Sequence, residues 1–492
     1  MNADAAILGT GGIVAIATYL VALLGLGWMG RRAREEKSLA DFYLGGRSLG
    51  FLVLLLTLYA TQYSGNTLIG FAGKAYREGF TFLVAVTFMT GVVAVQFLYA
   101  PRLQKLSHEH GFITPSDFIM HRFQSRTFAA LISISGILAL LNYVLTNLKG
   151  IGYAVETVTG GKISFATGVI FLSVIILIYE TLGGLRSVAW TDVLQGVILL
   201  IGCLIIFTVI LFAYEGTTGI FTTLKEQRPE FWRPLTGKDL RWWASTLIVV
   251  SGGIAIYPHA VQRIFAAKNS QTLKRAYLFM LFLPLATTLL MVFVGWVGAA
   301  QIPGLDKSGS ESITLLMLGE LSQKYPALQI VIVLFVAAVF AAIMSTVDSA
   351  LLSISSMITQ DLVRPRNPQL DEARLTAIGK YISWGLMGLM VWAAISMDKT
   401  IWWFIQIKVE LLVQALPAIL LGIHWKTLRT GPAMWGFVVG ILLVVFFAYG
   451  ATLTDGIPSR PFDMHGGFSA LIVNLLITIG GSLAGKTASS DS

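Results

Sequence analysis

The sequence predicts an all-α protein that crosses a membrane about thirteen times. Three observations support this fold class. Among 492 residues, 55% are hydrophobic and only 12% are charged, whereas soluble domains carry about 25% charged residues. Apolar runs of about 20 residues, the length that spans a bilayer, recur along the whole chain. No segment between these runs is polar or Pro/Ser-rich enough to predict a soluble domain or a linker.

The predicted spans are joined by short loops. They cover approximately residues 8–29, 49–72, 80–100, 128–157, 163–182, 189–213, 241–263, 275–300, 326–358, 376–396, 400–424, 431–451 and 466–484. The first span follows a terminus without a basic stretch and is too long for the apolar region of a cleaved signal. We therefore expect it to be retained.

Basic residues gather on alternate connections between the spans. They lie at 31–37, 101–126, 263–275, 364–380 and 424–429. By the positive-inside rule these loops face the cytoplasm. We expect a multi-pass protein of the cell inner (plasma) membrane, with its N-terminus outside the cell and its C-terminus in the cytoplasm. The net charge of +9 is then explained by this asymmetry and does not indicate a nucleic-acid partner.

The polar stretch from Ala60 to Tyr76 begins within the second predicted span and runs past its end. Its polar side chains and glycines are Thr61, Gln62, Ser64, Asn66, Thr67, Gly70 and Gly73. Lipid offers these groups no hydrogen-bond partners. The pattern therefore predicts a helix broken in mid-membrane, with freed carbonyls that can hold a cation.

The seventh span is interrupted in a similar way, by Gly252, Gly253 and Pro258. Paired broken segments five spans apart are typical of an inverted five-plus-five repeat around a central binding site. Glycine and proline also serve helix packing in membranes, but the matched positions favour the repeat.

The ninth span carries hydroxyls and a carboxylate on one helical face. Ser345, Asp348 and Ser349 follow one another at helical spacing, and Thr346 lies beside them. Hard oxygen ligands suit a small hard cation. Serine and threonine also pack helices, but a carboxylate at membrane depth is costly and indicates function.

A second acid, Asp192, follows Trp190 at the start of the sixth span. It is either an interfacial acid paired with Arg186 or a buried partner of the hydroxyl face. Two buried acids with hydroxyls form a site for Na⁺ or for a proton, and the sequence leaves both open.

Three further ionisable residues lie within predicted spans. Lys149 can pair with an anionic solute, find an internal partner or snorkel to the interface. Lys408 and Glu410 are two residues apart, so we expect them to point to different sides of their helix.

Other functional patterns are missing from the sequence. There is no Walker loop, no Gly-rich dinucleotide motif and no Ser/His/Asp, CxxC or HExxH arrangement. The single cysteine, Cys203, lies in an apolar run. We therefore expect neither an enzyme, nor an organic cofactor, nor a metal cluster of cysteines.

Four motifs carry a resemblance to a known family. They are DFYLGGRSLG at 41–50, YETLGGLRSVAWTD at 179–192, PHAVQR at 258–263 and AAIMSTVDSALL at 341–352. Together they resemble the sodium:solute symporter family over nearly the whole chain. The resemblance implies a single transporter domain of the leucine-transporter type. Residues 1–47 supply an extra first helix and loop, 48–425 a ten-helix inverted-repeat core, and 426–492 two additional helices and a short tail.

The resemblance also implies site residues. A main Na⁺ site would use the carbonyls of Ala60, Tyr63 and Ala342 and the hydroxyls of Ser345 and Thr346. A possible second Na⁺ site would use Asp192, Asp348 and Ser349. The expected solute site comprises Gln62, Ser64, Thr67, Phe82, Asn142, Ile254 and Tyr257.

The function expected from this resemblance is Na⁺-coupled import of a small organic solute by alternating access, with one or two Na⁺ as coupling ions. Lys149 and Lys408 favour a carboxylate-bearing solute, such as a monocarboxylate, a pantothenate-like compound or an amino acid. Proton coupling on the same fold and a transporter-like solute sensor are the alternatives. Besides solute and lipid, no obligatory protein partner is expected.

Overall fold

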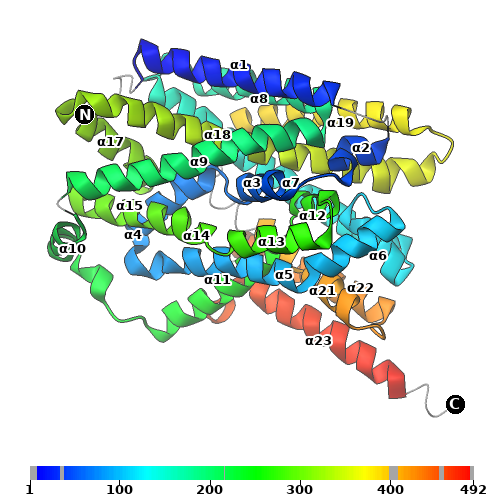
Figure 1. The fold of residues 1–492 in the computed structure, drawn as a ribbon. Coiled ribbons are helices and arrows are strands. Elements are labelled where there is room, and N and C mark those ends of the chain that lie inside the picture. Colours follow the sequence, from blue (N-terminus) through cyan, green and yellow to red (C-terminus); the bar gives the residue numbers. More distant parts are fainter. Residues whose placement is uncertain (1–7, 34–37, 215, 398–407, 454–458, 488–492) are drawn as a thin grey trace.

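A computed structural model describes residues 8–33, 38–214, 216–397, 408–453 and 459–487. This part of the chain is helical and contains no strand. Its long helices lie beside one another in one bundle (Figure 1). The all-helical class predicted from the sequence is therefore confirmed.

The helices have the following bounds: α1 Thr10–Arg32, α2 Leu39–Leu44, α3 Phe51–Gln62, α4 Phe71–Glu78, α5 Val84–His110, α6 Pro115–Phe123, α7 Arg126–Val158, α8 Phe165–Gly183, α9 Leu185–Ala213, α10 Gly216–Gln227, α11 Gly237–Ala255, α12 Pro258–Ala266, α13 Ser270–Met280, α14 Leu283–Ala286, α15 Thr288–Gln301, α16 Lys307–Glu311, α17 Ile313–Lys324, α18 Gln329–Met357, α19 Glu372–Ser396, α21 Leu416–His424, α22 Thr430–Leu453 and α23 Gly466–Thr487.

Ten helices in the described ranges are long and apolar enough to cross a membrane. The pair α11 and α12, bent by 50°, adds an eleventh span. The predicted span 49–72 contains no single qualifying helix because α3 is short and ends at Gln62. The predicted span 400–424 falls partly on residues 398–407, outside the described part. The total of thirteen spans and the inverted repeat remain predictions.

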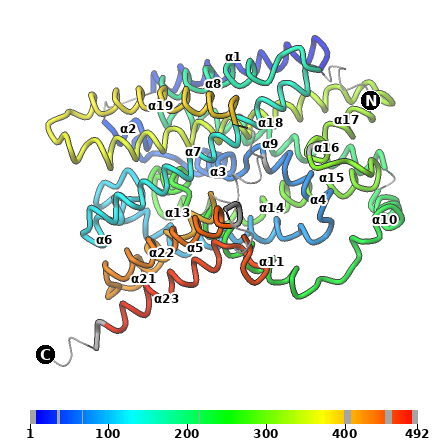
Figure 2. The backbone as a smooth tube through the Cα atoms, turned by 180° about the vertical axis from the view of Figure 1, so that it is seen from behind, coloured from blue at the N-terminus to red at the C-terminus, as the bar shows by residue number. Residues whose placement is uncertain are grey.

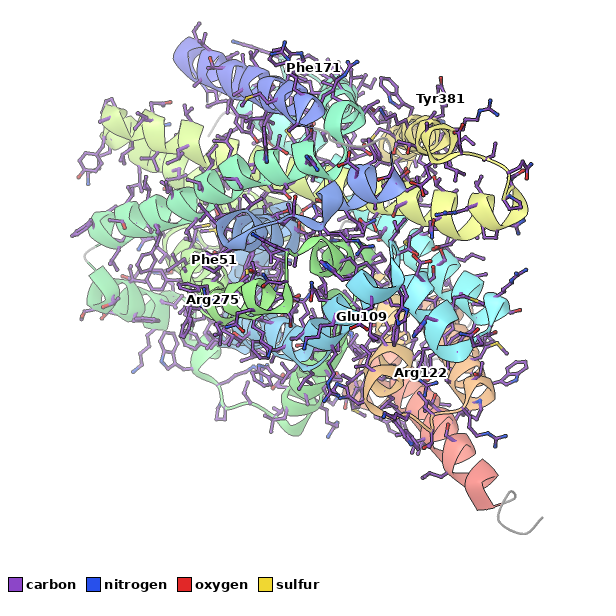
Figure 3. All side chains as sticks on the ribbon, turned by 45° about the vertical axis from the view of Figure 1, so that its right-hand side comes forward. Phe51, Glu109, Arg122, Phe171, Arg275 and Tyr381 are labelled. Carbon is purple, nitrogen blue, oxygen red and sulfur yellow. The ribbon has the colours of Figure 1, made fainter. Side chains whose placement is uncertain are left out.

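Large apolar side chains cover the outside of the bundle. Phe171 on α8 is 58% exposed and Tyr381 on α19 is 78% exposed, and both project away from the helices (Figure 3). A soluble protein seldom exposes large apolar patches. In a membrane the same surface contacts lipid chains.

The connecting helices lie at the two ends of the bundle. Figures 1 and 2 show α10 and α17 at one end and α2 and α6 at the other. Helix α1 begins at the α10 end, whereas α23 finishes at the α6 end. This arrangement fits an odd number of crossings.

The two interrupted segments lie next to each other. Leu49, before α3, accepts a hydrogen bond from the Lys268 amide at 3.0 Å and donates one to the Ala266 carbonyl at 3.1 Å. In the second segment Pro258 is the first residue of α12. Proline cannot continue the hydrogen bonding of a preceding helix, which explains why the chain bends there.

The last two helices form a hairpin on the outside of the bundle (Figure 2). Hydrogen bonds join it to the segment before α21. The Gln414 amide nitrogen donates to the Gly467 carbonyl at 3.0 Å, and the Asn474 amide nitrogen donates to the Gln414 carbonyl at 2.8 Å. All three residues are within the apolar bundle, where such bonds are not exchanged with water.

Candidate cation site and solute cavity

The first helix break lies within the polar stretch from Ala60 to Tyr76. Helix α3 ends at Gln62, and Tyr63 takes an extended conformation with φ −102° and ψ 105°. A π-helical turn, 66–70, then leads into α4. The break lies against α18, because a Cβ atom added at Gly65 would overlap the Ile343 side chain. Only glycine permits this close approach.

The hydroxyl face of α18 contacts the end of α3. The Ser345 hydroxyl lies 3.1 Å from the Ala60 carbonyl oxygen and 3.2 Å from the Ala342 carbonyl oxygen. The Thr346 hydroxyl donates to the Ala342 carbonyl at 2.8 Å. All of these groups are buried. A hydroxyl can rotate its hydrogen away and accept instead, so these hard oxygens suit an alkali cation. Tyr63, the remaining expected ligand, is the extended residue directly after α3.

The two buried acids lie beside this contact. Asp192 on α9 accepts a hydrogen bond from the Thr57 hydroxyl. Asp348 accepts one from the Tyr179 hydroxyl at 2.6 Å and one from the Ser349 hydroxyl at 3.2 Å. Asp192 and Asp348 are each 0% exposed. The alternative that Asp192 is an interfacial acid paired with its neighbour on α9 is therefore wrong.

The guanidinium of Arg263 links these groups. It lies 3.3 Å from an Asp192 oxygen and also donates to the Ser349 hydroxyl. Arg263 is 0% exposed, so its assignment to the basic loop 263–275 is wrong. Arg186 pairs instead with Asp41, at 2.9 Å. A buried charge needs a partner, which explains why Arg263 and Asp192 meet in the core.

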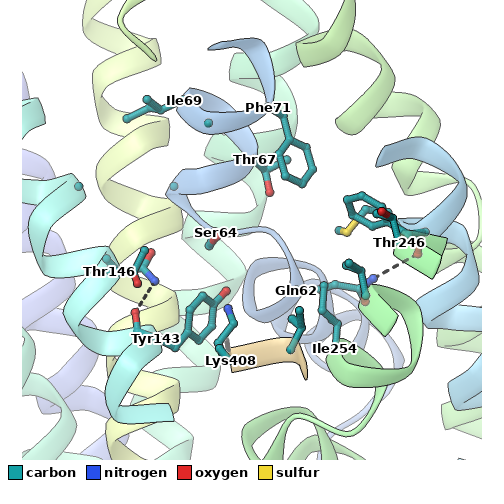
Figure 4. A pocket seen from close by; sticks show the side chains of 18 of the residues that line it. Gln62, Ser64, Thr67, Ile69, Phe71, Tyr143, Thr146, Thr246, Ile254 and Lys408 are labelled. Carbon is teal, nitrogen blue, oxygen red and sulfur yellow. Dashed lines mark hydrogen bonds between the residues drawn. The ribbon is translucent and has the colours of Figure 1, made fainter. Parts of the chain in front are cut away.

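A cavity of about 100 Å³ lies between the first break, α7 and α11 (Figure 4). Six of the seven expected solute residues line it: Gln62, Ser64, Thr67, Phe82, Ile254 and Tyr257. The seventh, Asn142, lies on α7 outside the lining, where its carbonyl accepts a hydrogen bond from Thr146. Lining residues that the sequence did not single out for the solute site include Tyr143, Asn147, Trp242 and Thr246.

The two intramembrane lysines have different surroundings. Lys408 lines the cavity, with its ammonium 3.3 Å from the ring centre of Tyr143 and 4.9 Å from that of Tyr257. Lys149 is also buried but donates to the Met397 carbonyl and is not among the described lining residues. The residue with an internal partner is thus Lys149, and Lys408 faces the cavity.

Glu410 points away from Lys408, as the two-residue spacing predicts. Its carboxylate lies 3.1 Å from the His465 imidazole and 3.0 Å from the Gly467 amide nitrogen. The other imidazole nitrogen lies 2.9 Å from the Thr246 hydroxyl. His465 also lines the cavity. No signal in the sequence indicated that His465 belongs to the site, because this residue lies outside the four family motifs, in the link before α23.

Comparison with protein families gives one extended match. The model of the sodium:solute symporter family covers residues 42–440. The chain is 27% identical to the sodium/pantothenate symporter of Escherichia coli (strain K12), over 96% of each chain. It is 26% identical to the sodium/proline symporter of Staphylococcus aureus (strain bovine RF122 / ET3-1), over 88% of this chain and 85% of that one.

Solved structures support the fold. A Na⁺-coupled sialic acid symporter in a substrate-bound, outward-open state superposes with a TM-score of 0.79 at 22% identity, over 96% of this chain and 97% of that one. Mhp1, a nucleobase-cation-symport-1 family transporter, superposes with a TM-score of 0.55 at 14% identity, over 91% of this chain and 95% of that one. At these identities the likeness concerns the fold alone.

Proposed function

The chain belongs to the sodium:solute symporter family, and on that basis we propose that it imports a small organic solute together with Na⁺ by alternating access. The protein would work in the plasma membrane, with its N-terminus outside and its C-terminus in the cytoplasm. The observation that carries the proposal is the contact between the broken first segment and α18, in which the Ser345 hydroxyl reaches the Ala60 carbonyl.

Na⁺ would bind at this contact. Its proposed ligands are the carbonyls of Ala60, Tyr63 and Ala342 and the hydroxyls of Ser345 and Thr346. Because these groups come from two elements that a bound ion would hold together, Na⁺ binding would favour one arrangement of the break against α18. A ligand shifts a conformational equilibrium by its difference in affinity for the two states, and the solute is coupled through the same difference.

A second Na⁺ at Asp192, Asp348 and Ser349 remains a prediction. The charge of Asp192 is already compensated by Arg263, which also bonds Ser349. A cation at this place would have to displace or share that guanidinium. The chemistry therefore favours the site at Ser345 as the first to fill.

The driving force is sufficient for accumulation. Each Na⁺ that enters gains about 2.3 kcal/mol per 100 mV of membrane potential, and about 1.4 kcal/mol per tenfold concentration gradient. A single Na⁺ can therefore drive a neutral or singly charged solute against a concentration gradient.

The proposed solute carries a carboxylate. Lys408 supports this, since its ammonium faces the cavity between two tyrosine rings. The solutes in the names of the relatives, pantothenate, proline and sialic acid, all contain a carboxyl group.

Uptake into proteoliposomes tests the proposal. Purified protein is reconstituted, and radiolabelled pantothenate, proline and short monocarboxylates are offered under an imposed Na⁺ gradient, under a pH gradient without Na⁺, and without any gradient. We expect accumulation with the Na⁺ gradient alone. Accumulation that follows the pH gradient in the absence of Na⁺ would replace Na⁺ coupling with proton coupling.

A further inference from the structure

We infer that Lys408 determines solute specificity by binding the solute carboxylate in the cavity, while the apolar body of the solute packs on the aromatic residues of the same cavity. This inference rests on the proposed function, in which the cavity holds the transported solute. It adds the residue that recognises the solute carboxylate and the apolar character of the rest of the solute.

The first argument is the charge balance around Lys408. The residue is 2% exposed, and no carboxylate of the described residues lies within ion-pair distance of it. Glu410, two residues along the chain, is engaged by His465 and Gly467. A buried ammonium without a paired anion is costly. An anionic solute would supply the missing partner.

The second argument is the geometry of the ammonium. Two tyrosine faces, Tyr143 and Tyr257, cover it at 3.3 and 4.9 Å, and a cation over an aromatic face is partly stabilised. An ammonium nevertheless carries three hydrogen-bond donors, and aromatic faces accept them poorly. The free donors have the cavity beside them (Figure 4). A carboxylate can accept two of them at once.

The third argument separates Lys408 from other cations. Lys149 donates to a main-chain carbonyl. Arg77, which also lines the cavity, donates to Ser310 and to the Lys307 carbonyl. Arg263 is paired with Asp192. Among these cationic side chains, Lys408 is therefore the one whose ammonium has no hydrogen-bond acceptor among the described residues.

The remaining lining residues define the body of the solute. Many of the cavity's side chains, apart from the two tyrosines, are aromatic or aliphatic: Ile69, Phe71, Phe82, Phe88, Met89, Trp242, Val250, Ile254, Ile343 and Val409. Apolar surface favours an apolar ligand by burial, and ligand pockets commonly combine such walls with a few polar groups that fix orientation. The cavity therefore fits a monocarboxylate with a compact apolar or aromatic body.

The test uses matched pairs of probes on purified protein in lipid nanodiscs. The probes are 3-phenylpropionate, 4-methylvalerate and pantothenate, each with its neutral carboxamide, and binding is measured by calorimetry in NaCl and in KCl. We expect at least one carboxylate to bind more tightly than its amide. Lys408→Met should weaken carboxylate binding by about 10- to 100-fold and change amide binding much less. Lys408→Arg should restore part of the preference.

Lys149→Met is the matched control, because it removes a second buried lysine outside the described lining. It should leave the ratio of carboxylate to amide affinity unchanged. Should Lys408→Met fail to fold, reductive methylation of Lys408 in the wild-type protein gives an independent measurement. A bound carboxylate should slow methylation of Lys408, and the amide at equal concentration should not.

Several outcomes would overturn the inference. These are an unchanged carboxylate preference in Lys408→Met, unprotected Lys408 in the presence of a bound carboxylate, and a wild-type protein that binds none of the carboxylates. Carboxylate binding that depends on Lys408 but is equal in NaCl and KCl would instead contradict Na⁺ coupling and leave the role of Lys408 intact.

Discussion

Removing the Ser345 hydroxyl should weaken Na⁺ binding strongly. In the structure this oxygen bridges the Ala60 and Ala342 carbonyls, at 3.1 and 3.2 Å. It would supply one of five expected ligands. An interaction with a charged group contributes about 1.5–3 kcal/mol, so Ser345→Ala should raise the half-saturating Na⁺ concentration by about 10- to 150-fold. Thr346→Ala should act similarly, and Thr346→Ser should stay close to wild type because it keeps the hydroxyl.

Thermal unfolding in the absence of solute measures this effect. Na⁺ at 100 times its dissociation constant stabilises the folded protein by about 2.7 kcal/mol, and a hundredfold weaker site leaves about 0.4 kcal/mol at the same concentration. The Na⁺-dependent shift in melting temperature should therefore nearly disappear in Ser345→Ala. Uptake measured against Na⁺ concentration provides a second readout.

Ser353→Ala is the matched control for the same helix. Ser353 is 0% exposed, and its hydroxyl has no hydrogen-bond partner among the described residues. Its removal should leave the Na⁺ response as it is. A wild-type Na⁺ response in both Ser345→Ala and Thr346→Ala, or an equal loss in the control, would refute the assigned site.

Three other substitutions test the surroundings of the site. Arg263→Leu leaves Asp192 as an uncompensated buried charge and should destabilise the protein by about 3–5 kcal/mol, whereas adding Asp192→Asn should recover much of the melting temperature. Gly65→Ala brings a Cβ against Ile343 and should lower the free energy of unfolding by about 1–3 kcal/mol. The double variant Gly65→Ala, Ile343→Ala should recover part of this stability in the same thermal unfolding assay. Burial raises the pKa of the Glu311 carboxyl, so the folded state holds this proton more tightly than the unfolded state. Stability from this group is therefore lost as pH rises above the unfolded value, and Glu311→Gln should gain melting temperature over wild type near neutral pH but not at pH 4.

Local chemistry in the sequence was sufficient to predict the helix break and the hydroxyl-bearing face of α18, whereas the expected contact between them came from the family resemblance. Polar residues around Ser64 have no partners in lipid, and Ser345, Asp348 and Ser349 recur at helical spacing. Both signals lie within single segments. The opposite directions of Lys408 and Glu410 also followed from their spacing.

Features that depend on distant contacts could not be predicted in this way. Arg263 lies next to a loop that contains lysines, and its burial is explained only by Asp192, which is 71 positions away along the chain. His465 approaches the cavity through bonds to Thr246 and Glu410, which belong to other segments. Asn142 is polar and lies on the expected helix, but its position outside the lining depends on the rotation of α7.

The attachment of α23 has a consequence for how members of this family can be recombined. His465 and Gly467 connect the start of this helix to Glu410, and Asn474, further along it, donates to the Gln414 carbonyl. A chimera that took α22, α23 and the link between them from another symporter would therefore replace His465, a residue that lines the cavity. We expect the solute selectivity of the chimera to shift partly toward that of the donor symporter, even though the hairpin lies at the periphery of the bundle.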